Sequence, residues 1–200
     1  MEEVFTSVYK TRKWGDNYCS DYEGSSGPGS SIPYNINTYV PFLKNFIQNN
    51  NIKTVVDLGC GDFRCGQVIY NDMDVTYTGY DAYKKVVEHN KTKAFTPKFN
   101  FIHLDFCHKK EEIETADLCI LKDVIQHWSL QNIYQFLDYL VENKLFKYIL
   151  IINCGNQKED NTDIPDGEYR ELSCNFFPLK KYNTTVIYKY DTKECSVIRL

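Results

Sequence analysis

Five short apolar runs alternate with stretches of helical periodicity between Asn51 and Ile152, and this alternation restricts the fold more than any other feature of the sequence. Runs that are apolar on both faces are typical of parallel strands covered by helices. The pattern therefore predicts an α/β domain with five parallel strands. The expected strands are residues 54–58, 75–80, 99–104, 118–121 and 148–152.

The chain on either side of these runs completes the expected fold. Apolar residues at helical spacing predict helices over residues 34–50 and 129–142, and Ser129 is placed to cap the second one. Runs 184–190 and 195–200 flank a polar turn and predict a C-terminal antiparallel hairpin. We expect a single domain of 200 residues with four parts, namely an N-terminal cap (1–33), a ligand-binding core (34–154), a loop (155–182) and the hairpin (183–200).

Composition and charge argue against several classes of protein. A net charge of −4 and a pI near 5.6 disfavour a surface for nucleic acid phosphates. No apolar run approaches the ~20 residues that span a bilayer, and the acidic N-terminus lacks the apolar stretch of a signal peptide. The eight cysteines include no Cys-x-x-Cys pair. We therefore expect reduced thiols, no zinc site, no membrane contact and a reducing, cytoplasmic compartment.

An acidic residue ends each of the first three expected strands. Asp57 precedes the turn Gly59-Cys60-Gly61, Asp81 follows about twenty residues after that turn, and Asp105 ends the third strand. Glycines let a ligand approach the backbone, and ligands of open α/β sheets bind outside the carboxyl ends of the strands. Asp81 is placed to accept the two hydroxyls of a ribose, and Asp105 to reach an adenine edge with Phe106 beside it for stacking.

The glycine turn differs from that of a nicotinamide dinucleotide site. Such sites require Gly-x-Gly-x-x-Gly, whereas here Gly66 comes two positions too late. The negative charge of Asp57 opposes a pyrophosphate but suits a cofactor with an ammonium group, such as S-adenosylmethionine. The alternative is a tight turn with surface acids and no ligand.

Residues 55–62 resemble motif I of the class I S-adenosylmethionine-dependent methyltransferases, and the resemblance extends over residues 51–152. It implies a Rossmann-like, mostly parallel seven-stranded sheet with an antiparallel C-terminal hairpin and helices on both faces. It also implies that the core binds S-adenosylmethionine and that loop 155–182 contacts the substrate. The residues implied to bind the cofactor are Ser26, Gly27, Asp57, Gly59, Cys60, Gly61, Asp81, Ala82, Asp105, Phe106 and Lys122.

A narrower resemblance covers most of the chain and points to an acceptor. The chain is similar to methyltransferases encoded in glycan-synthesis clusters of bacteria and in large DNA viruses, with the chlorovirus-type rhamnose O-methyltransferase domain as the nearest specific family. It implies a deoxyhexose acceptor such as rhamnose, the host cytoplasm as the compartment of a viral protein, and a longer multidomain glycosyltransferase protein as one context. The similarity rests on Tyr9, Trp14-Gly15, residues 26–30, residues 122–129, Asn161, Asp163-Ile164, Gly167, Tyr169-Arg170 and Leu172.

A sugar hydroxyl is barely acidic, so its methylation benefits from a general base. His127 follows the fourth expected strand at the entry of a helix, where histidine suits that role. Asp123 either orients the imidazole or acts as a base itself. The alternative for His127 is a capping or packed histidine beside Trp128.

Two further segments have a functional and a structural interpretation. The loop over residues 160–170 is either a solvated acidic loop or a substrate lid, and the aromatic N-terminal segment either walls the acceptor cleft or packs a helix. The residues that would contact the acceptor are Asp163, Glu168 and Arg170 from the loop, and Tyr9, Trp14, Tyr18 and Tyr22 from the N-terminal segment.

The fifth strand precedes Asn153-Cys154-Gly155-Asn156, with no carboxylate before Glu159, so we expect a reaction without a metal ion. Two other functions remain open. One is methylation of RNA or of a protein side chain, against which the acidic pI and the absence of Asn-Pro-Pro-Tyr weigh. The other is a catalytically silent subunit of the same fold, against which the three retained acids weigh.

Overall fold

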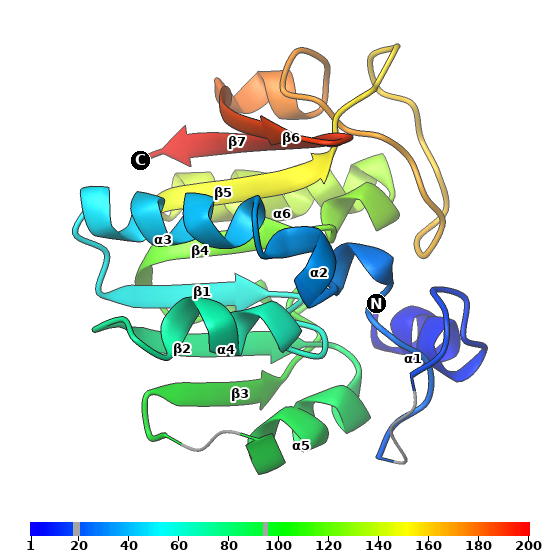
Figure 1. Cartoon of the computed structure of the whole chain (residues 1–200). Helices are drawn as coiled ribbons and strands as arrows, with labels where there is room; N and C mark the ends of the chain where they lie inside the picture. Colours follow the sequence, from blue (N-terminus) through cyan, green and yellow to red (C-terminus); the bar gives the residue numbers. More distant parts are fainter. Residues whose placement is uncertain (18–20, 94–95) are drawn as a thin grey trace. The chain divides into compact units, whose positions relative to one another are not determined.

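The computed structural model describes residues 1–17, 21–93 and 96–200, so Tyr18 and Cys19 lie outside the described residues. Seven strands form a mixed sheet. The chain divides into unit 1, Met1–Phe106, and unit 2, Cys107–Leu200. Figure 1 labels the helices and strands of both units.

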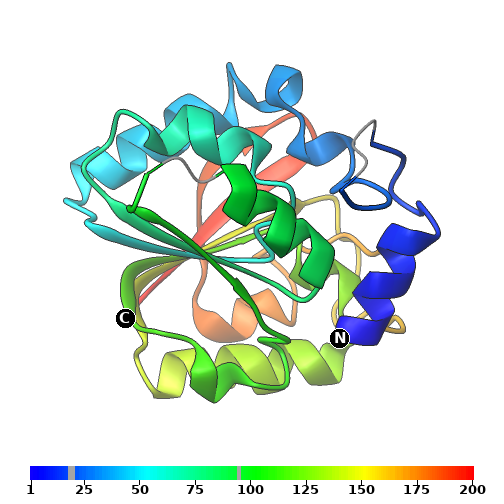
Figure 2. The same cartoon turned by 90° about the horizontal axis from the view of Figure 1, so that it is seen from below.

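Unit 1 contains the first three predicted strands, which are β1 (Thr54–Leu58), β2 (Thr76–Asp81) and β3 (Phe99–His103). They are parallel, and β2 pairs with both of the others. Only Thr76 of β2 is exposed, as expected for a strand covered on both faces. Figure 2 shows helices α3 (Tyr39–Asn49), α4 (Arg64–Tyr70) and α5 (Lys84–Lys93) on one face of these strands.

The N-terminal part of unit 1 holds α1 (Glu2–Lys10), the 3-10 helix η1 (Pro28–Ser30) and the short helix α2 (Ile32–Asn35). Figure 1 shows α1 beyond the carboxyl ends of β1, β2 and β3. Val8 and Tyr9 are the buried residues of α1. The first helix therefore covers the edge of the strands at which the sequence predicts a ligand site.

Unit 2 contains β4 (Ala116–Lys122), β5 (Phe146–Cys154), β6 (Thr185–Tyr190) and β7 (Lys193–Arg199). β4 pairs with β5 in parallel, and β7 pairs with β5 and β6 in antiparallel orientation. Helix α6 (Leu130–Glu142) begins after Ser129, whose hydroxyl accepts the Asn132 N–H at 3.5 Å. Three 3-10 turns complete the unit, η2 (Lys110–Glu112), η3 (Ile125–His127) and η4 (Leu179–Tyr182).

The structure confirms the predicted fold class, a mostly parallel seven-stranded sheet with an antiparallel C-terminal hairpin and flanking helices. The helix predicted over residues 34–50 is divided into α2 and α3. The buried Asn35 amide donates to the carbonyls of Gly29 and Ser31, both at 2.8 Å, and Thr38 leaves the helical conformation with φ −129° and ψ −87°. These local polar contacts end α2 after one turn, although the apolar spacing continues.

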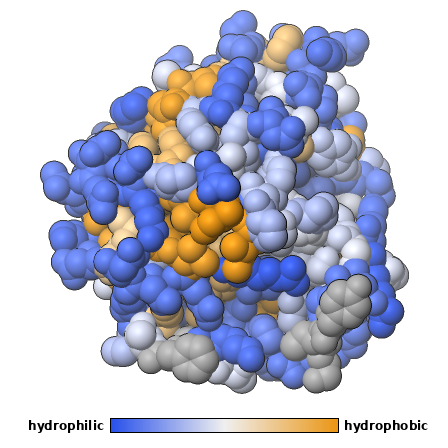
Figure 3. All heavy atoms as spheres, viewed as in Figure 1, coloured by the Kyte–Doolittle hydropathy of each residue, from blue (hydrophilic) through white to orange (hydrophobic). Residues whose placement is uncertain are grey.

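Figure 3 shows apolar side chains gathered on the face of unit 1 that carries α2. Two large aliphatic side chains of this region are exposed, Ile32 by 39% and Ile36 by 37%. Among the described residues, no helix combines the length and the apolar character that crossing a bilayer requires.

Candidate active site

The glycine turn that follows β1 has the backbone conformation that glycine favours. Gly59 has φ 85° and Gly61 has φ 52°, both in the left-handed region. The N–H groups of Gly59 and Cys60 donate to the Tyr80 carbonyl at 2.8 and 3.0 Å. From α5, the buried Asn90 amide donates to the Gly61 carbonyl at 2.7 Å. The turn is thus held by β2 and by α5.

Asp81, at the end of β2, accepts two backbone hydrogen bonds. One carboxylate oxygen accepts the Gly61 N–H at 3.0 Å, and the other accepts the Tyr83 N–H at 2.8 Å. The residue is only 7% exposed, and burial raises its pKa to about 6. The adjacent Ala82 is also buried, and its carbonyl is 3.1 Å from Nε2 of His103. The predicted ribose acid therefore also supports the glycine turn.

Two more acids lie next to the turn. Asp57 accepts a hydrogen bond from the hydroxyl of the buried Tyr77 at 2.8 Å. Asp62, directly after the turn, forms an ion pair with Nε of Arg64 at 3.0 Å, and burial raises its pKa. The sequence analysis did not assign Asp62 a role, although an acid directly after Gly-x-Gly at a helix entry is a signal that could have identified it.

Residues of the N-terminal segment pack onto this turn. Ser26 Oγ accepts the Asp62 N–H at 2.9 Å and lies 2.8 Å from the Tyr9 hydroxyl. A Cβ atom on Gly61 would lie 2.5 Å from Ser26 Oγ, so only glycine allows this approach. The Tyr9 ring is buried and stacks on Tyr83 with 4.4 Å between ring centroids. The sequence predicts that Tyr9 contacts the acceptor and that Ser26 contacts the cofactor. The structure brings both side chains onto the same turn.

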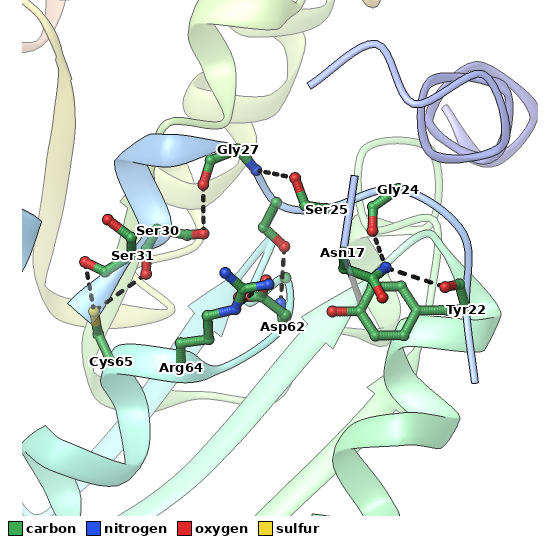
Figure 4. A network of polar contacts seen from close by, with 12 residues as sticks. Asn17, Tyr22, Gly24, Ser25, Gly27, Ser30, Ser31, Asp62, Arg64 and Cys65 are labelled. Carbon is green, nitrogen blue, oxygen red and sulfur yellow. Dashed lines mark hydrogen bonds and ion pairs between the residues drawn. The ribbon is translucent and has the colours of Figure 1, made fainter. Parts of the chain in front are cut away.

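The loop around Ser26 is held by further polar contacts, which Figure 4 shows. Gly27 N–H donates to Ser25 Oγ at 3.3 Å, and the Ser30 hydroxyl donates to the Gly27 carbonyl at 2.8 Å. The Cys65 thiol, on α4, donates to the Ser30 carbonyl at 3.3 Å. The Ser25 hydroxyl donates a hydrogen bond to the backbone carbonyl of Trp14 at 3.2 Å. Trp14 is one of the residues that the sequence predicts to contact the methyl acceptor. The loop therefore has a defined conformation against α4.

Asp105, the predicted adenine-side acid, lies against the start of α1. One carboxylate oxygen accepts the Met1 amino group at 2.9 Å and the Glu2 N–H at 3.1 Å. Phe106 beside it is buried. Glu23, which the sequence analysis did not identify, accepts the Tyr83 hydroxyl at 2.6 Å, and Lys85 and Tyr83 together lower its pKa to about 2.

In unit 2, Asp123 follows β4 with φ 60°, a left-handed conformation that is uncommon for an aspartate. Its carboxylate lies between Lys122 Nζ, at 2.9 Å, and Lys193 Nζ. Burial opposes ionisation, but the two ammonium groups outweigh it and lower the pKa of Asp123 to about 2. Such an acid stays ionised and is a weak base. Lys193 also contacts the Cys154 thiol at 3.2 Å, and no sequence pattern indicated this pairing.

His127 lies on η3 and is buried. Its Nδ1 is 2.8 Å from the Glu168 carbonyl, which can only accept, so the neutral ring carries its proton on Nδ1. Nε2 then keeps a lone pair. The Glu168 carbonyl, and not the Asp123 carboxylate, is the group placed to orient this nitrogen of the imidazole.

Gln126 contacts the same ring, and the sequence analysis did not identify it. Its Oε1 accepts the Cys154 N–H at 3.1 Å, which directs its amide nitrogen to His127 Nε2 at 3.4 Å. The backbone carbonyl of Gln126 accepts the Arg170 N–H at 3.1 Å, and the His127 carbonyl accepts the Gly167 N–H at 2.7 Å. Residues 167–170 are thereby fixed beside η3.

The acidic loop supplies side chains to the start of α6. Asp163 Oδ1 accepts the Leu130 N–H at 2.8 Å, and Asp166 Oδ1 accepts the Ser129 N–H at 2.6 Å. Carboxylates at a helix N-terminus satisfy free N–H groups and complement the helix dipole. Arg170 is buried, whereas Tyr169 is 51% exposed with its ring 6.0 Å from that of His127. A role of these loop residues in acceptor binding stays a prediction.

Within residues 1–17, 21–93 and 96–200, no group of three or more His, Cys, Asp or Glu side chains is arranged to hold a metal ion.

Comparison with known proteins places this geometry in context. Residues 56–141 match the methyltransferase domain family, and a comparison with curated proteins found no match. The structure of DhpI in complex with S-adenosylhomocysteine aligns with a TM-score of 0.70 at 10% identity, covering 99% of this chain and 96% of that chain. Magnesium protoporphyrin IX methyltransferase (ChlM) from Synechocystis PCC 6803, with bound S-adenosylhomocysteine, aligns with a TM-score of 0.67 at 12% identity over 100% of both chains.

A third similar structure is the mitomycin 7-O-methyltransferase MmcR, with a TM-score of 0.57 at 16% identity, covering 76% of this chain and 50% of that chain. At these identities the structural neighbours show the fold. The family match over residues 56–141 and the acids at the strand ends agree with that Rossmann-like fold.

Proposed function

We propose that this protein transfers a methyl group from S-adenosylmethionine to a hydroxyl oxygen of a sugar, with a deoxyhexose such as rhamnose as the acceptor. The observation that carries the O-methylation is the contact between His127 Nδ1 and the Glu168 carbonyl, which holds the ring proton on Nδ1 and makes Nε2, beside the Gln126 amide, the nitrogen that can accept a proton. The likeness to an O-methyltransferase, MmcR, supports the same chemistry.

The residues of unit 1 fit S-adenosylmethionine. The absence of a Cβ on Gly61 lets the Ser26 hydroxyl pack against the glycine turn, with the Tyr9 hydroxyl next to it, so polar groups gather at this turn. Asp57 and Asp62 supply negative charge for the amino group of the cofactor, and Asp81 supplies carboxylate oxygens for the ribose. Asp105 supplies carboxylate oxygens on the adenine side of the cofactor. When bound, the cofactor supplies a methyl group already activated on a sulfonium.

His127 performs the proton transfer in this proposal. As the acceptor oxygen forms its bond to the methyl carbon, Nε2 of His127 takes the hydroxyl proton, and the electron pair of the broken carbon–sulfur bond stays on sulfur. The resulting imidazolium keeps its Nδ1–H bond to the Glu168 carbonyl. Asp123 is left out of this step, because its two lysine partners lower its pKa to about 2 and make it a weak base.

Tyr169 contributes an aromatic face beside His127, and aromatic faces pack against the C–H faces of sugars. The ring is exposed and lies 6.0 Å from the imidazole. We propose it as an acceptor contact in addition to Tyr9, Trp14, Asp163, Glu168 and Arg170.

The experiment is mass spectrometry of acceptors incubated with enzyme and S-adenosylmethionine, with and without a chelator. The panel holds a methyl rhamnoside, a second deoxyhexoside, a hexoside, a short RNA and a peptide mixture. We expect a gain of one methyl group on a deoxyhexoside that survives the chelator. Methylation of RNA or peptide alone would overturn the sugar assignment.

The base assignment is tested with His127→Ala and with His108→Ala as a matched control, because His108 is an exposed histidine of the same unit. We expect His127→Ala to keep its affinity for S-adenosylhomocysteine and to lose turnover by about 10²–10⁴-fold, as for loss of a general base. His108→Ala should match the wild type. Turnover of His127→Ala near the wild-type rate would refute the base role.

A further inference from the structure

Arg170 carries a buried guanidinium on the loop that follows β5. The side chain is 4% exposed. Among the residues that the structure describes, none accepts a hydrogen bond from Nε, Nη1 or Nη2. Burial lowers the pKa of the guanidinium. A buried guanidinium with five N–H groups usually donates hydrogen bonds to a carboxylate or a phosphate, and leaving those N–H groups without acceptors is costly.

The nearest acids of the loop are committed elsewhere. Asp163 Oδ1 is 3.9 Å from Arg170 Nη1, too far for a hydrogen bond, and the same oxygen accepts the N–H groups of Leu130 and Ile164 at 2.8 and 2.9 Å. Asp166 uses one oxygen for the Ser129 N–H and the other for the Asn132 amide, at 2.6 and 2.8 Å. Both carboxylates therefore serve the start of α6.

The start of α6 and the Arg170 guanidinium both lie close to the carboxylate of Asp163. The N-terminus of this 13-residue helix carries partial positive charge, and its Leu130 N–H donates to Asp163. Asp163 Oδ1 lies between the Leu130 N–H and Arg170 Nη1, and the Asp163 side chain is 61% exposed. An exposed carboxylate thus holds the position between a helix N-terminus and a buried guanidinium, where an external anion of the same shape would fit.

We propose that Arg170 and the N-terminus of α6 bind an oxyanion of the acceptor, a carboxylate or a phosphate, which replaces the Asp163 carboxylate. The inference rests on the proposed function, because it places the acceptor beside His127. Residues 167–170 pair with η3 through the Gly167 and Arg170 N–H groups, so the guanidinium belongs to the segment that orients the imidazole. The sugar acceptor of the proposed function would then carry an oxyanion, as in a deoxyhexose phosphate or a uronate.

The first test measures affinity by calorimetry with the full chain and matched probes. The probes are a methyl glucoside and the corresponding methyl glucuronide for the carboxylate arm, and methyl rhamnoside and rhamnose 1-phosphate for the phosphate arm. We expect at least one charged probe to bind tenfold or more tightly than its neutral partner, and the arm that does so identifies the oxyanion. Equal affinity within both pairs would overturn the inference.

Variants separate binding from structure. Arg170→Met should abolish the preference for the charged probe, and Arg170→Lys should retain part of it because it keeps the charge but loses the planar fork. Asp163→Asn keeps the oxygen that caps α6 but removes the competing charge, so it should bind the charged probe several-fold more tightly. Arg199→Met is the control, because Arg199 is an exposed arginine of the same unit.

Thermal unfolding without ligand supplies the second readout. A buried guanidinium whose N–H groups lack acceptors destabilises the fold, and its ion pair with Asp163 is long at 3.9 Å, so Arg170→Met should melt at the same temperature as the wild type or higher. A drop of several degrees would show that Arg170 serves the fold and would overturn the inference. Charged-probe binding that depends on Arg170 supports the inference even if no sugar is methylated, whereas methylation of neutral sugars unaffected by Arg170→Met refutes it and leaves the proposed function intact.

Discussion

Asp81 offers the most direct test of the cofactor site, because its carboxylate is buried and accepts hydrogen bonds from two backbone N–H groups. Burial raises its pKa from 3.8 to about 6, against two backbone N–H bonds that favour the ionised form. Each pKa unit of difference between the folded and unfolded states corresponds to about 1.4 kcal/mol. Ionised Asp81 therefore destabilises the folded state by about 3 kcal/mol above pH 6.

The pH dependence of stability follows from the direction of this shift. Between pH 3.8 and about 6 the folded state binds the Asp81 proton and the unfolded state does not. The contribution of this group to the free energy of unfolding therefore falls as the pH rises through that window, and the destabilisation is absent below pH 3.8.

Asp81→Asn removes the charge and keeps the shape. It relieves about 3 kcal/mol of desolvation at pH 7 but loses one hydrogen bond from a backbone N–H to a charged group, which is worth about 1.5–3 kcal/mol. We expect a free energy of unfolding within about 1.5 kcal/mol of the wild type at pH 7, and a flatter pH dependence between pH 4 and 6. Affinity for S-adenosylhomocysteine should fall tenfold or more, because an amide accepts at one atom only.

Urea unfolding from pH 4 to 7.5 and calorimetry with S-adenosylhomocysteine measure these effects. Asp74→Asn is the matched control, an exposed acid of the same unit whose pKa Lys53 lowers. If Asp81→Asn keeps the wild-type slope between pH 4 and 6, Asp81 is not the titrating group. If it keeps wild-type affinity for S-adenosylhomocysteine, its assignment to the ribose is refuted.

Three further predictions follow from single contacts. Gln126→Glu replaces an N–H donor at His127 Nε2 by a carboxylate acceptor, which stabilises the imidazolium. The rise of kcat/KM should therefore occur at a pH about one unit higher or more. An unchanged pH profile would contradict this contact. Ser26→Ala leaves the Asp62 N–H without its acceptor and should lower the free energy of urea unfolding by about 1–3 kcal/mol; no loss would show that water replaces the hydroxyl. Asp166→Ala removes two hydrogen bonds from the start of α6, and its melting curve should report a loss of about 1–2 kcal/mol, compared with Asp160→Ala outside that helix start.

Most of the fold was predictable, because each element is specified by neighbouring residues. The apolar runs predicted all five parallel strands and the C-terminal hairpin, and the spacing of apolar residues predicted α6. The helix predicted over residues 34–50 was too long, because apolar spacing does not register the Asn35 side chain that bonds back to Gly29 and Ser31. Only the packed structure shows that this amide is buried.

The candidate site was predictable in its residue types and less so in its pairings. Acids at strand ends and a Gly-x-Gly turn are local signals, and the structure brings Asp81 to Gly61 as that pattern suggests. The partner of His127 is a backbone carbonyl 41 positions away, which carries no signal in its residue type. Of the two lysines that contact Asp123, one is 70 positions away.

The sequence by itself determined the strands, the glycine turn and the set of chemical groups available, because these depend on residues close together in the chain. The tertiary structure alone decided which groups meet. It placed α1 against Asp105, assigned Asp163 and Asp166 to the start of α6, and left the Arg170 guanidinium without hydrogen-bond partners among the described residues. The physical reason is that desolvation and hydrogen bonding act through space, so the protonation and partners of a buried group depend on how distant segments pack around it.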